Sequence, residues 1–399
     1  MNLDKISWVA RRFIGPVAVS AAMVLGLASC TLDYYVGYVY MTTAKQNPGL
    51  IDQYAIDFQT GALITNGNQV AAGNDPVALI PATNGQFIYV ANKLDSTVQE
   101  FAVQADGTLA SKNVYHTIGN QPVAFAIDPQ GKFLYVAVTY QTGTSGPGDV
   151  NIFPVNADNS LGTPTAVNVG NNPVGIVTSY FNHFIYVLDQ EASPNATILG
   201  FSQNPTTGAL TPIPGTNITS VGGKTVATGY AAGVVPSAIA EEPTSRFVYV
   251  TDQIANQLIG YTVQPNGSLV PMVNGPFATG LFPVNLTIDP TGTLIYVADY
   301  NANAIQGYVI DLGTGTPSGA VGAFATGVGV GPTCVNIDPA LGNFLYTSNS
   351  LDNTITAARV TVNTGALSGV QNSPFPGSGT PTCLTSVPNG SHATQVITP

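Results

Sequence analysis

The stretch Phe87–Asn92, with the sequence FIYVAN, decides the fold because similar stretches recur along the whole chain. Each copy has a tyrosine at its third position, and successive tyrosines lie 46 to 63 residues apart. A period of roughly 40–50 residues that contains several strands is typical of a β-propeller. The seven copies are Tyr38–Thr43 (YVYMTT), Phe87–Asn92, Phe133–Val138 (FLYVAV), Phe184–Asp189 (FIYVLD), Phe247–Asp252 (FVYVTD), Leu294–Asp299 (LIYVAD) and Phe344–Asn349 (FLYTSN).

Other motifs recur around each copy. A Gly-x-x-Pro motif leads into an apolar strand upstream, and a turn such as Asp128–Gly131 separates that strand from the tyrosine strand. A third strand follows, for example Gln257–Val263, and a turn such as Thr207–Leu210 leads to a weaker outer strand. Each unit is therefore predicted to be a four-stranded blade.

The two ends of the repeat predict how the ring closes. The first unit begins at a second strand, Tyr34–Thr43, and the chain ends with a spare first strand, Thr382–Val387. Pairing these two strands completes the N-terminal blade and protects its edge. The tyrosine strands are apolar at nearly every position, as expected where both faces of a blade are covered by neighbours. We therefore expect an all-β, seven-bladed β-propeller over residues 34–399, closed by the C-terminal strand.

The composition agrees with this fold class. The chain has 399 residues, of which only 10 are Lys or Arg and 21 are Asp or Glu, while 44% are hydrophobic. Disordered chains have few apolar residues and a high net charge, so disorder is excluded. The 43 glycines and 29 prolines argue against long helices.

The N-terminus predicts export and lipidation. Lys5, Arg11 and Arg12 precede the apolar stretch Phe13–Ser29, which ends in small residues directly before Cys30. This pattern predicts a signal peptide over residues 1–29, and Leu-Ala-Ser-Cys resembles the bacterial lipobox, which implies lipidation of Cys30. Residues 30–33 would be a short tether, and Thr31 resembles the outer-membrane sorting signal. An uncleaved anchor and an ordinary secretory cleavage remain the alternatives. We expect an exported protein held at the bacterial cell envelope, on the outer membrane, through its lipid.

The scarcity of basic residues excludes one class of partner. Without residues 1–29 the chain keeps only seven Lys or Arg, and they are scattered. Nucleic acid requires clustered Lys and Arg to neutralise its phosphates, so it is not expected as a partner.

The motifs Tyr89–Asn92 and Tyr249–Asp252, together with the Gly-x-x-Pro and Asp-Pro-x-Gly turns, resemble the YVTN-repeat family. They are also similar to the seven-bladed lactonase (6-phosphogluconolactonase-like) propellers. The resemblance covers about residues 34–399 and implies the propeller fold. It leaves the function open, because these propellers include both enzymes and binding proteins.

The resemblance to lactonases also implies histidines near the Gly-x-x-Pro turns and basic groups for a phosphorylated substrate. The residues that follow these prolines include no histidine; His116 lies on an outer strand, and His183 and His392 lie at turns on the opposite rim. Lys45 and Lys93 are the best basic pair available. A phosphorylated sugar requires Arg forks or Lys clusters, so phosphogluconolactonase activity is disfavoured.

Carboxylates and amides end most tyrosine strands, and two interpretations are open. They form a ring of oxygens for a cation or sugar, or they cap the loop that follows each strand. We favour capping, since a residue repeated in every blade belongs to the scaffold more often than to a site. The positions are Thr43, Asn92, Val138, Asp189, Asp252, Asp299 and Asn349.

A ligand is expected where the repeat is interrupted, on one rim of the propeller. Blade four is the longest, with a Gly-rich insertion around Ser220–Gly233 and Glu241-Glu242 where a sister blade has Ile288-Asp289. The irregular loops offer aromatics, carboxylates and amides, which suit a carbohydrate or protein ligand. The candidate ligand-binding residues are Tyr140, Asp189, Gln190, Glu191, Asp252, Asp299, Tyr300 and Asn301.

Cys334 and Cys383 occur in matching Pro-Thr-Cys contexts on the innermost strands of adjacent blades. Export permits a disulfide that would fasten the ring closure, although equivalent positions could also project in parallel. Two cysteines without a nearby histidine do not make a zinc site, and we expect no metal, cofactor or catalytic residue.

The main hypothesis is therefore a cell-envelope lipoprotein propeller that serves as a binding or scaffold module. One alternative is a lactonase-type hydrolase that acts on a non-phosphorylated lactone or sugar through carboxylates. Another is a structural surface protein that assembles through its blade edges.

Overall fold

The computed structural model describes residues 35–44, 47–191, 196–221, 224–324, 329–361 and 364–390. The described residues form β-strands joined by turns and loops, and they include no helix long and apolar enough to cross a membrane. The predicted signal peptide, Cys30 and the tether lie outside the described residues.

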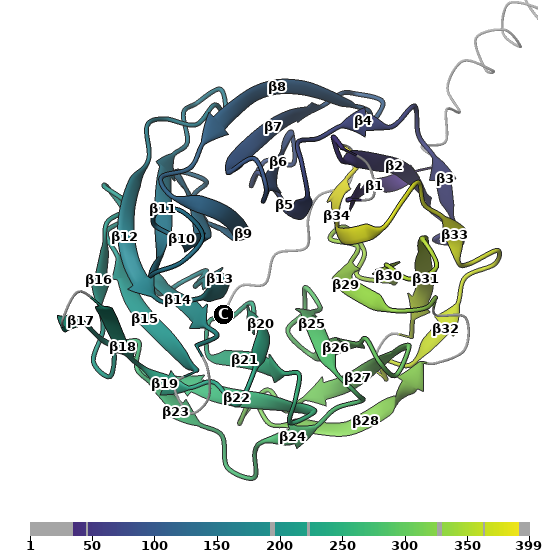
Figure 1. Ribbon diagram of the computed structural model, residues 1–399. Coiled ribbons are helices and arrows are strands. Elements are labelled where there is room, and N and C mark those ends of the chain that lie inside the picture. Colours follow the sequence, from purple (N-terminus) through teal and green to yellow (C-terminus); the bar gives the residue numbers. More distant parts are fainter. Residues whose placement is uncertain are drawn as a thin grey trace, which may run out of the picture. The chain divides into compact units, whose positions relative to one another are not determined.

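Seven blades surround a central axis, which confirms the predicted fold class (Figure 1). Blades are numbered here by their tyrosine strands, from Tyr40 in blade 1 to Tyr346 in blade 7. Blade 1 contains β1 (Tyr35–Thr43), β2 (Leu50–Asp57), β3 (Leu63–Thr65), β4 (Val70–Ala71) and β34 (Pro381–Pro388). Blade 2 contains β5 (Pro76–Pro81), β6 (Phe87–Asn92), β7 (Thr97–Val103) and β8 (Leu109–His116). Blade 3 contains β9 (Asn120–Ile127), β10 (Phe133–Tyr140), β11 (Gly148–Pro154) and β12 (Thr165–Gly170).

The other four blades repeat this order. Blade 4 contains β13 (Pro173–Thr178), β14 (Phe184–Asp189), β15 (Thr197–Gln203), β16 (Leu210–Pro212) and β19 (Tyr230–Ala231). Blade 5 contains β20 (Pro236–Glu241), β21 (Phe247–Asp252), β22 (Gln257–Val263), β23 (Leu269–Pro271) and β24 (Phe277–Ala278). Blade 6 contains β25 (Pro283–Ile288), β26 (Leu294–Asp299), β27 (Ala304–Ile310) and β28 (Pro317–Phe324). Blade 7 contains β29 (Pro332–Ile337), β30 (Phe344–Asn349), β31 (Thr354–Val360), β32 (Leu367–Gly369) and β33 (Phe375–Pro376).

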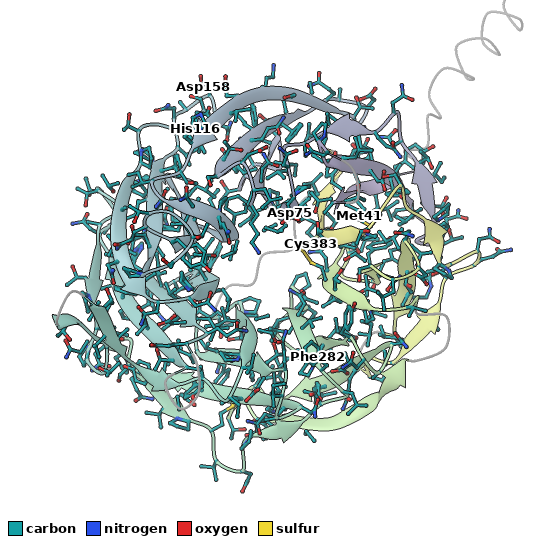
Figure 2. The ribbon with its side chains drawn as sticks, in the orientation of Figure 1. Met41, Asp75, His116, Asp158, Phe282 and Cys383 are labelled. Atoms are coloured by element: carbon teal, nitrogen blue, oxygen red, sulfur yellow. A yellow bond between two sulfur atoms is a disulfide. The ribbon has the colours of Figure 1, made fainter. Side chains whose placement is uncertain are left out.

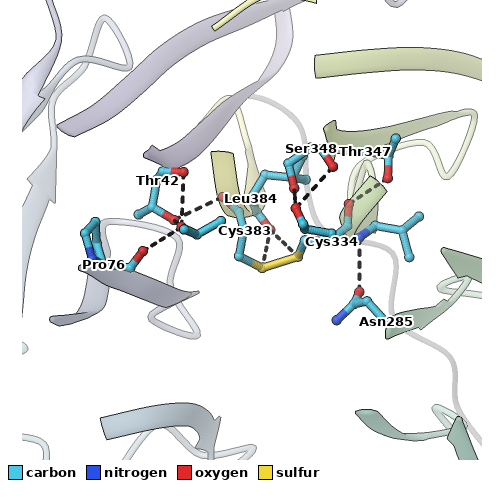
Figure 3. The surroundings of a disulfide bond; sticks show 11 residues. Thr42, Pro76, Asn285, Cys334, Thr347, Ser348, Cys383 and Leu384 are labelled. Atoms are coloured by element: carbon cyan, nitrogen blue, oxygen red, sulfur yellow. Dashed lines mark hydrogen bonds between the residues drawn. A yellow bond between two sulfur atoms is a disulfide. The ribbon is translucent and has the colours of Figure 1, made fainter. Parts of the chain in front are cut away.

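The ring closes as the two ends of the repeat predict. The C-terminal strand β34 pairs antiparallel with β1, in the register Tyr40↔Thr385, and becomes the innermost strand of blade 1. A disulfide between Cys334 on β29 and Cys383 on β34, with an S–S distance of 2.09 Å, joins blades 7 and 1 (Figure 3). Beside it, the hydroxyl of Thr382 donates to the carbonyl of Pro76 in blade 2.

The repeated tyrosine has one role in all seven blades. Its side chain is fully buried, and its hydroxyl donates to a backbone carbonyl in a turn of the next blade. In blade 2, for example, Tyr89 donates to Asn159 at 2.7 Å, and the last bond runs from Tyr346 back to Gly61 at 3.0 Å. Each acceptor residue has a left-handed φ, which suits the glycine or asparagine found there. These acceptors are Gly107, Asn159, Gly208, Gly267, Gly315, Gly365 and Gly61.

The insertion in blade 4 differs from the expected Gly-rich loop. Part of it forms a two-stranded hairpin of β17 (Asn217–Val221) and β18 (Lys224–Thr228). The hairpin contacts β12 of blade 3, where the amide of Asn168 donates to the hydroxyl of Thr225 at 3.2 Å. It therefore covers the outer part of blades 3 and 4.

Strand direction defines two rims. The Gly-x-x-Pro loops and the loops that follow the tyrosine strands lie together on one rim, here called the Gly-x-x-Pro rim. The Asp-Pro-x-Gly turns and the start of β1 at Tyr35 lie on the other, here called the turn rim.

Candidate functional site

The carboxylates that end the tyrosine strands of blades 4 and 5 hold the Gly-x-x-Pro loops of their own blades. Asp189 accepts hydrogen bonds from the N–H groups of Asn171 and Asn172, the latter at 2.7 Å. Burial raises the pKa of Asp189 to about 6, although these two N–H groups favour its charged form.

Asp252 repeats this arrangement in blade 5. It accepts from the N–H groups of Val234 and Val235 and also from Ile254 and Ala255 in the loop that follows the strand. Both Asp189 and Asp252 have no exposed surface. Both residues therefore cap loops. Asp189 holds the Gly-x-x-Pro loop that precedes its blade, whereas Asp252 holds both that loop and the loop that follows its strand.

The glycine of the motif is required by the same contact. A Cβ added at Gly233 would lie 2.2 Å from the Asp252 carboxylate, and one added at Gly170 would lie 2.1 Å from that of Asp189. Both glycines also have a left-handed φ. Any larger residue would displace the carboxylate from its loop.

Asp299 in blade 6 has the same position but different surroundings. Its side chain is fully buried, yet its two oxygens accept no hydrogen bond of normal geometry from the described residues. Burial raises its pKa to about 7, and the nearby N–H of Gly280 opposes this shift only in part.

The residue before the proline explains the difference. In blades 4 and 5 that residue, Asn172 or Val235, lies outside the left-handed region, and the loop N–H groups face the carboxylate. In blade 6 it is Phe282, with φ of 60°, and its N–H donates to the side chain of Asn256 in blade 5 at 2.7 Å. The other blades with a left-handed residue at this position are blades 2, 3 and 7, whose strands end in the uncharged residues Asn92, Val138 and Asn349. Asp299 is thus a carboxylate at a position where blades 2, 3 and 7, which share its loop conformation, have a neutral residue.

The remaining predicted ligand residues also lie on this rim. Gln190 donates from its amide to the carbonyl of Pro236 at 2.7 Å and so joins blades 4 and 5. Glu191 is half-buried beside Asp189 and helps to raise the pKa of Asp189. Tyr140 is half-buried and pairs with Asn120 at the end of β10.

Tyr300 and Asn301 follow Asp299 directly. The ring of Tyr300 packs against that of Phe282 with 6.2 Å between centroids, while Asn301 is exposed. The predicted residues therefore lie on blades 3 to 6 of one rim. Asp189, Asp252 and Asp299 are buried within their blades and do not converge on a common point at the surface.

The residues that precede the prolines lie where the innermost strands begin on this rim, and they were not among the predicted site residues. Their sequence signal is their fixed place in Gly-x-x-Pro, directly before the proline. Figure 2 shows Asp75 beside the central opening, Phe282 over blade 6 and His116 at the outer edge. These mouth residues are Asp75, Gln121, Asn172, Val235, Phe282, Gly331 and Thr380.

A central cavity of about 210 Å³ is enclosed by the innermost strands. Its lining is mainly aliphatic, with Val77, Val123 and Val174 from three successive blades, and Ser237 and Asn285 among its polar groups. No Lys or Arg is among its lining residues, and Asp75 is the only charged residue at the mouth positions.

The other titratable residues considered in the sequence lie elsewhere. His116 ends the outer strand β8, His183 lies at the turn before β14, and His392 and Lys45 lie outside the described residues. Glu241 and Glu242 are on the turn rim, where Glu241 accepts from the hydroxyl of Ser179 and burial raises its pKa to about 8. The described residues contain no group of three or more potential metal ligands.

A family model for the seven-bladed lactonase β-propeller matches residues 37–174 and 182–337, about three quarters of the chain. The chain belongs to this lactonase family. Family membership fits the lactonase alternative more closely than it fits a pure scaffold. A comparison with curated proteins found no match.

Solved structures share the propeller at low sequence identity. A candidate 6-phosphogluconolactonase from Bacteroides uniformis is 20% identical with a TM-score of 0.72, over 88% of this chain and 99% of that one. The periplasmic gluconolactonase PpgL of Pseudomonas aeruginosa is 17% identical with a TM-score of 0.72, over the same shares. Hydrazine synthase of Kuenenia stuttgartiensis is 15% identical with a TM-score of 0.60, over 81% of this chain and 95% of that one. Such identities establish a shared fold, which proteins with differing chemistry use.

Proposed function

We propose that this lactonase-family protein is a cell-envelope binding module that takes a neutral lactone at the channel mouth of its Gly-x-x-Pro rim. One observation carries the proposal: most side chains that line the central cavity are aliphatic and none is basic, whereas Asp189 and Asp252 are occupied in holding loops. Gln121 and Asn172 supply amides at the mouth, and Phe282 supplies an aromatic face. Aliphatic walls with a few polar groups are typical of small-molecule sites.

The charge of the site supports a ligand without phosphate. A phosphate group would lose its hydration at an aliphatic cavity and would require Arg or Lys in compensation. Neither the cavity lining nor the mouth residues include a basic side chain, and Asp75 repels anions, although the N–H of Lys93 donates to the carbonyl of Asp75. A lactone ring is neutral and presents a carbonyl oxygen that amide N–H groups can bind.

The test compares a neutral with a phosphorylated ligand. Isothermal titration of the full chain in detergent micelles should show binding of δ-valerolactone and no binding of 6-phosphogluconate. Phe282→Ala should weaken δ-valerolactone binding about tenfold. Phe181→Ala is the matched control, because Phe181 packs on Tyr180 on the turn rim, with 4.6 Å between ring centroids. Tighter binding of 6-phosphogluconate, or an equal loss in both variants, would contradict the proposal.

Hydrolysis of the lactone is the second candidate, and family membership favours it. Water would add to the ring carbonyl while a base takes its proton, and the ring C–O bond would then break to give the hydroxy acid. Asp75 is the carboxylate at the mouth and is half-buried, so it is the residue we assign as base. A pH-stat assay with δ-valerolactone should then show turnover that is lost in Asp75→Asn and kept in Asp352→Asn. Absence of turnover in the wild type would leave binding as the function.

The envelope location rests on the sequence of the N-terminus. β1 begins at Tyr35 on the turn rim, and only residues 31–34 separate it from Cys30. A lipid on Cys30 would therefore attach the propeller by its turn rim and leave the Gly-x-x-Pro rim facing the solvent. Mass spectrometry of the membrane fraction would test this, since a diacylglyceryl group on Cys30 is expected and a soluble protein without lipid would contradict it.

A further inference from the structure

A groove in blade 2 lies apart from the central cavity, beside an outer strand that differs from those of three other blades. It lies between the loop after β1, the Gly73–Pro76 segment and the outer strand β8, and it has a volume of about 640 Å³. Volumes of roughly 300–1,000 Å³ are typical of small-molecule sites. Its polar lining consists mainly of Asn74, Asn92, Asp95, Thr97, Gln99 and His116.

The floor of this groove is fixed by hydrogen bonds. The amide of Asn92 donates to the Thr97 hydroxyl at 3.2 Å and to Gln99 at 3.4 Å, and Gln99 donates to Ser111 at 3.1 Å. The Oδ1 of Asn92 accepts the N–H of Gly73 at 3.0 Å. These bonds hold the polar groups in place before any ligand arrives.

One wall of the groove joins Asn74 to Asp95. The backbone N–H and the side-chain amide of Asn74 both donate to the Asp95 carboxylate, each at 2.7 Å. These two hydrogen bonds fix the Asp95 carboxylate in this wall.

The opposite wall offers an apolar face. Val114 and His116 are two residues apart on β8, so both side chains point to the same face of the strand. Val114 is 55% exposed, which leaves an aliphatic surface next to the imidazole.

The residue that corresponds to His116 has different surroundings in three other blades. His116 pairs across the sheet with Thr97, and the corresponding residues of blades 4, 5 and 7 are Ala231, Ala278 and Pro376. There the carbonyl accepts a tyrosine hydroxyl from the next blade, as in Tyr308 to Ala278 at 2.7 Å and Tyr54 to Pro376 at 2.8 Å. Blade 2 has His116 at the end of a continuous outer strand, so its groove is not a requirement of the propeller scaffold.

We infer that this groove binds a neutral saccharide of one or two rings. Sugar hydroxyls donate and accept hydrogen bonds, and the Asn, Gln, Asp and His side chains here can serve both purposes. The C–H face of a sugar ring can pack on Val114. Among the described residues the lining contains no Lys or Arg, and the Asp95 carboxylate disfavours acidic or phosphorylated sugars.

Saturation-transfer NMR on the full chain tests this inference, with methyl α-D-glucopyranoside, methyl β-D-galactopyranoside and methyl N-acetyl-β-D-glucosaminide as probes. At least one glycoside should bind, and His116→Ala and Asp95→Ala should each weaken its binding about tenfold. His116 is exposed, so its replacement leaves the fold intact.

Asp352→Ala is the matched control, because Asp352 holds the N–H of Val330 in blade 7 as Asp95 holds that of Asn74. It should leave glycoside binding unchanged. The inference is overturned if none of the three glycosides binds, if His116→Ala binds as the wild type does, or if Asp352→Ala weakens binding as much as Asp95→Ala.

Discussion

Blades 5 and 6 place the same residue at the same position and use it differently. Asp252 accepts four backbone N–H groups, whereas Asp299 is equally buried and accepts no hydrogen bond of normal geometry among the described residues. The cause is the neighbouring loop, where Phe282 is left-handed and donates to Asn256 of the preceding blade. The same aspartate position thus holds a loop in blade 5 and lacks hydrogen-bond donors in blade 6.

The Asp299 carboxylate, which lacks these donors, lies in the same blade as Phe282, the residue that we propose contacts the ligand. The loop whose N–H groups turn away from Asp299 also places the ring of Phe282 against that of Tyr300. Local departures from good packing rules are expected at functional sites. The difference between the two blades therefore points to the mouth of blade 6 as a place shaped by binding.

The largest expected effect is the loss of the Asp252 carboxylate. Asp252→Asn replaces an acceptor oxygen by a donor beside several N–H groups, so the free energy of unfolding should fall by about 2–3 kcal/mol. Urea denaturation at pH 7 measures this. Equal destabilisation by Asp299→Asn would remove the distinction between the blades.

The second prediction concerns pH. Because the folded-state pKa of Asp299 is raised to about 7 from 3.8, the unfolded chain loses this proton first, and the wild type loses stability as pH rises from about 4 to about 7. Asp299→Asn removes this term. At pH 8 it should stabilise the protein by a few kcal/mol, and the gain should vanish near pH 4. Urea denaturation across this range gives the profile, and a variant whose stability difference is independent of pH would refute the assignment.

A smaller effect should be shared by both blades. Tyr249 and Tyr296 donate to Gly315 and Gly365 in their next blades, at 2.5 and 2.8 Å. Tyr249→Phe and Tyr296→Phe should each lower the free energy of unfolding by about 1 kcal/mol. A clear inequality between the two would mean that the blades also differ in their cores.

The smallest effect is expected at Asn256. Asn256→Gly keeps the left-handed backbone, with φ of 53°, and releases the N–H of Phe282, whose site is partly exposed, so stability should fall by only about 0.5 kcal/mol. The freed N–H can then turn to Asp299 and lower its pKa, which ¹³C NMR of the carboxyl carbon would detect. An unchanged pKa would show that Asn256 does not set the loop conformation.

The sequence was sufficient for the architecture because the repeat determines it. Seven tyrosines, the Gly-x-x-Pro motif and the spare C-terminal strand predict the blades and the closure. The pairing of Cys334 with Cys383 stayed open in the sequence, and the structure shows the disulfide. The hairpin Asn217–Thr228 was not predicted, although Gly222-Gly223 between alternating residues is a hairpin signal that could have indicated it.

The site was harder to predict because its determinants are not local. Nothing near Asp299 in the sequence shows that its loop partners are directed elsewhere, since that depends on Asn256 in another blade. The mouth residues Asp75 and Phe282 differ in type from blade to blade, so the repeat pattern does not distinguish them as site residues. The groove at His116 lies beside a continuous outer strand, whereas the outer strand of blade 5, for example, is interrupted. This difference is seen only in the strand pairing and not in the sequence.

The most direct test of this account is the affinity for δ-valerolactone of three proteins, measured by titration calorimetry: the wild type, Phe282→Ala and Asp299→Asn. The account places ligand chemistry at the mouth residues and not on the strand-end carboxylates. It predicts about a tenfold loss of affinity in Phe282→Ala and an unchanged affinity in Asp299→Asn. Retained affinity in Phe282→Ala together with a loss in Asp299→Asn would contradict it.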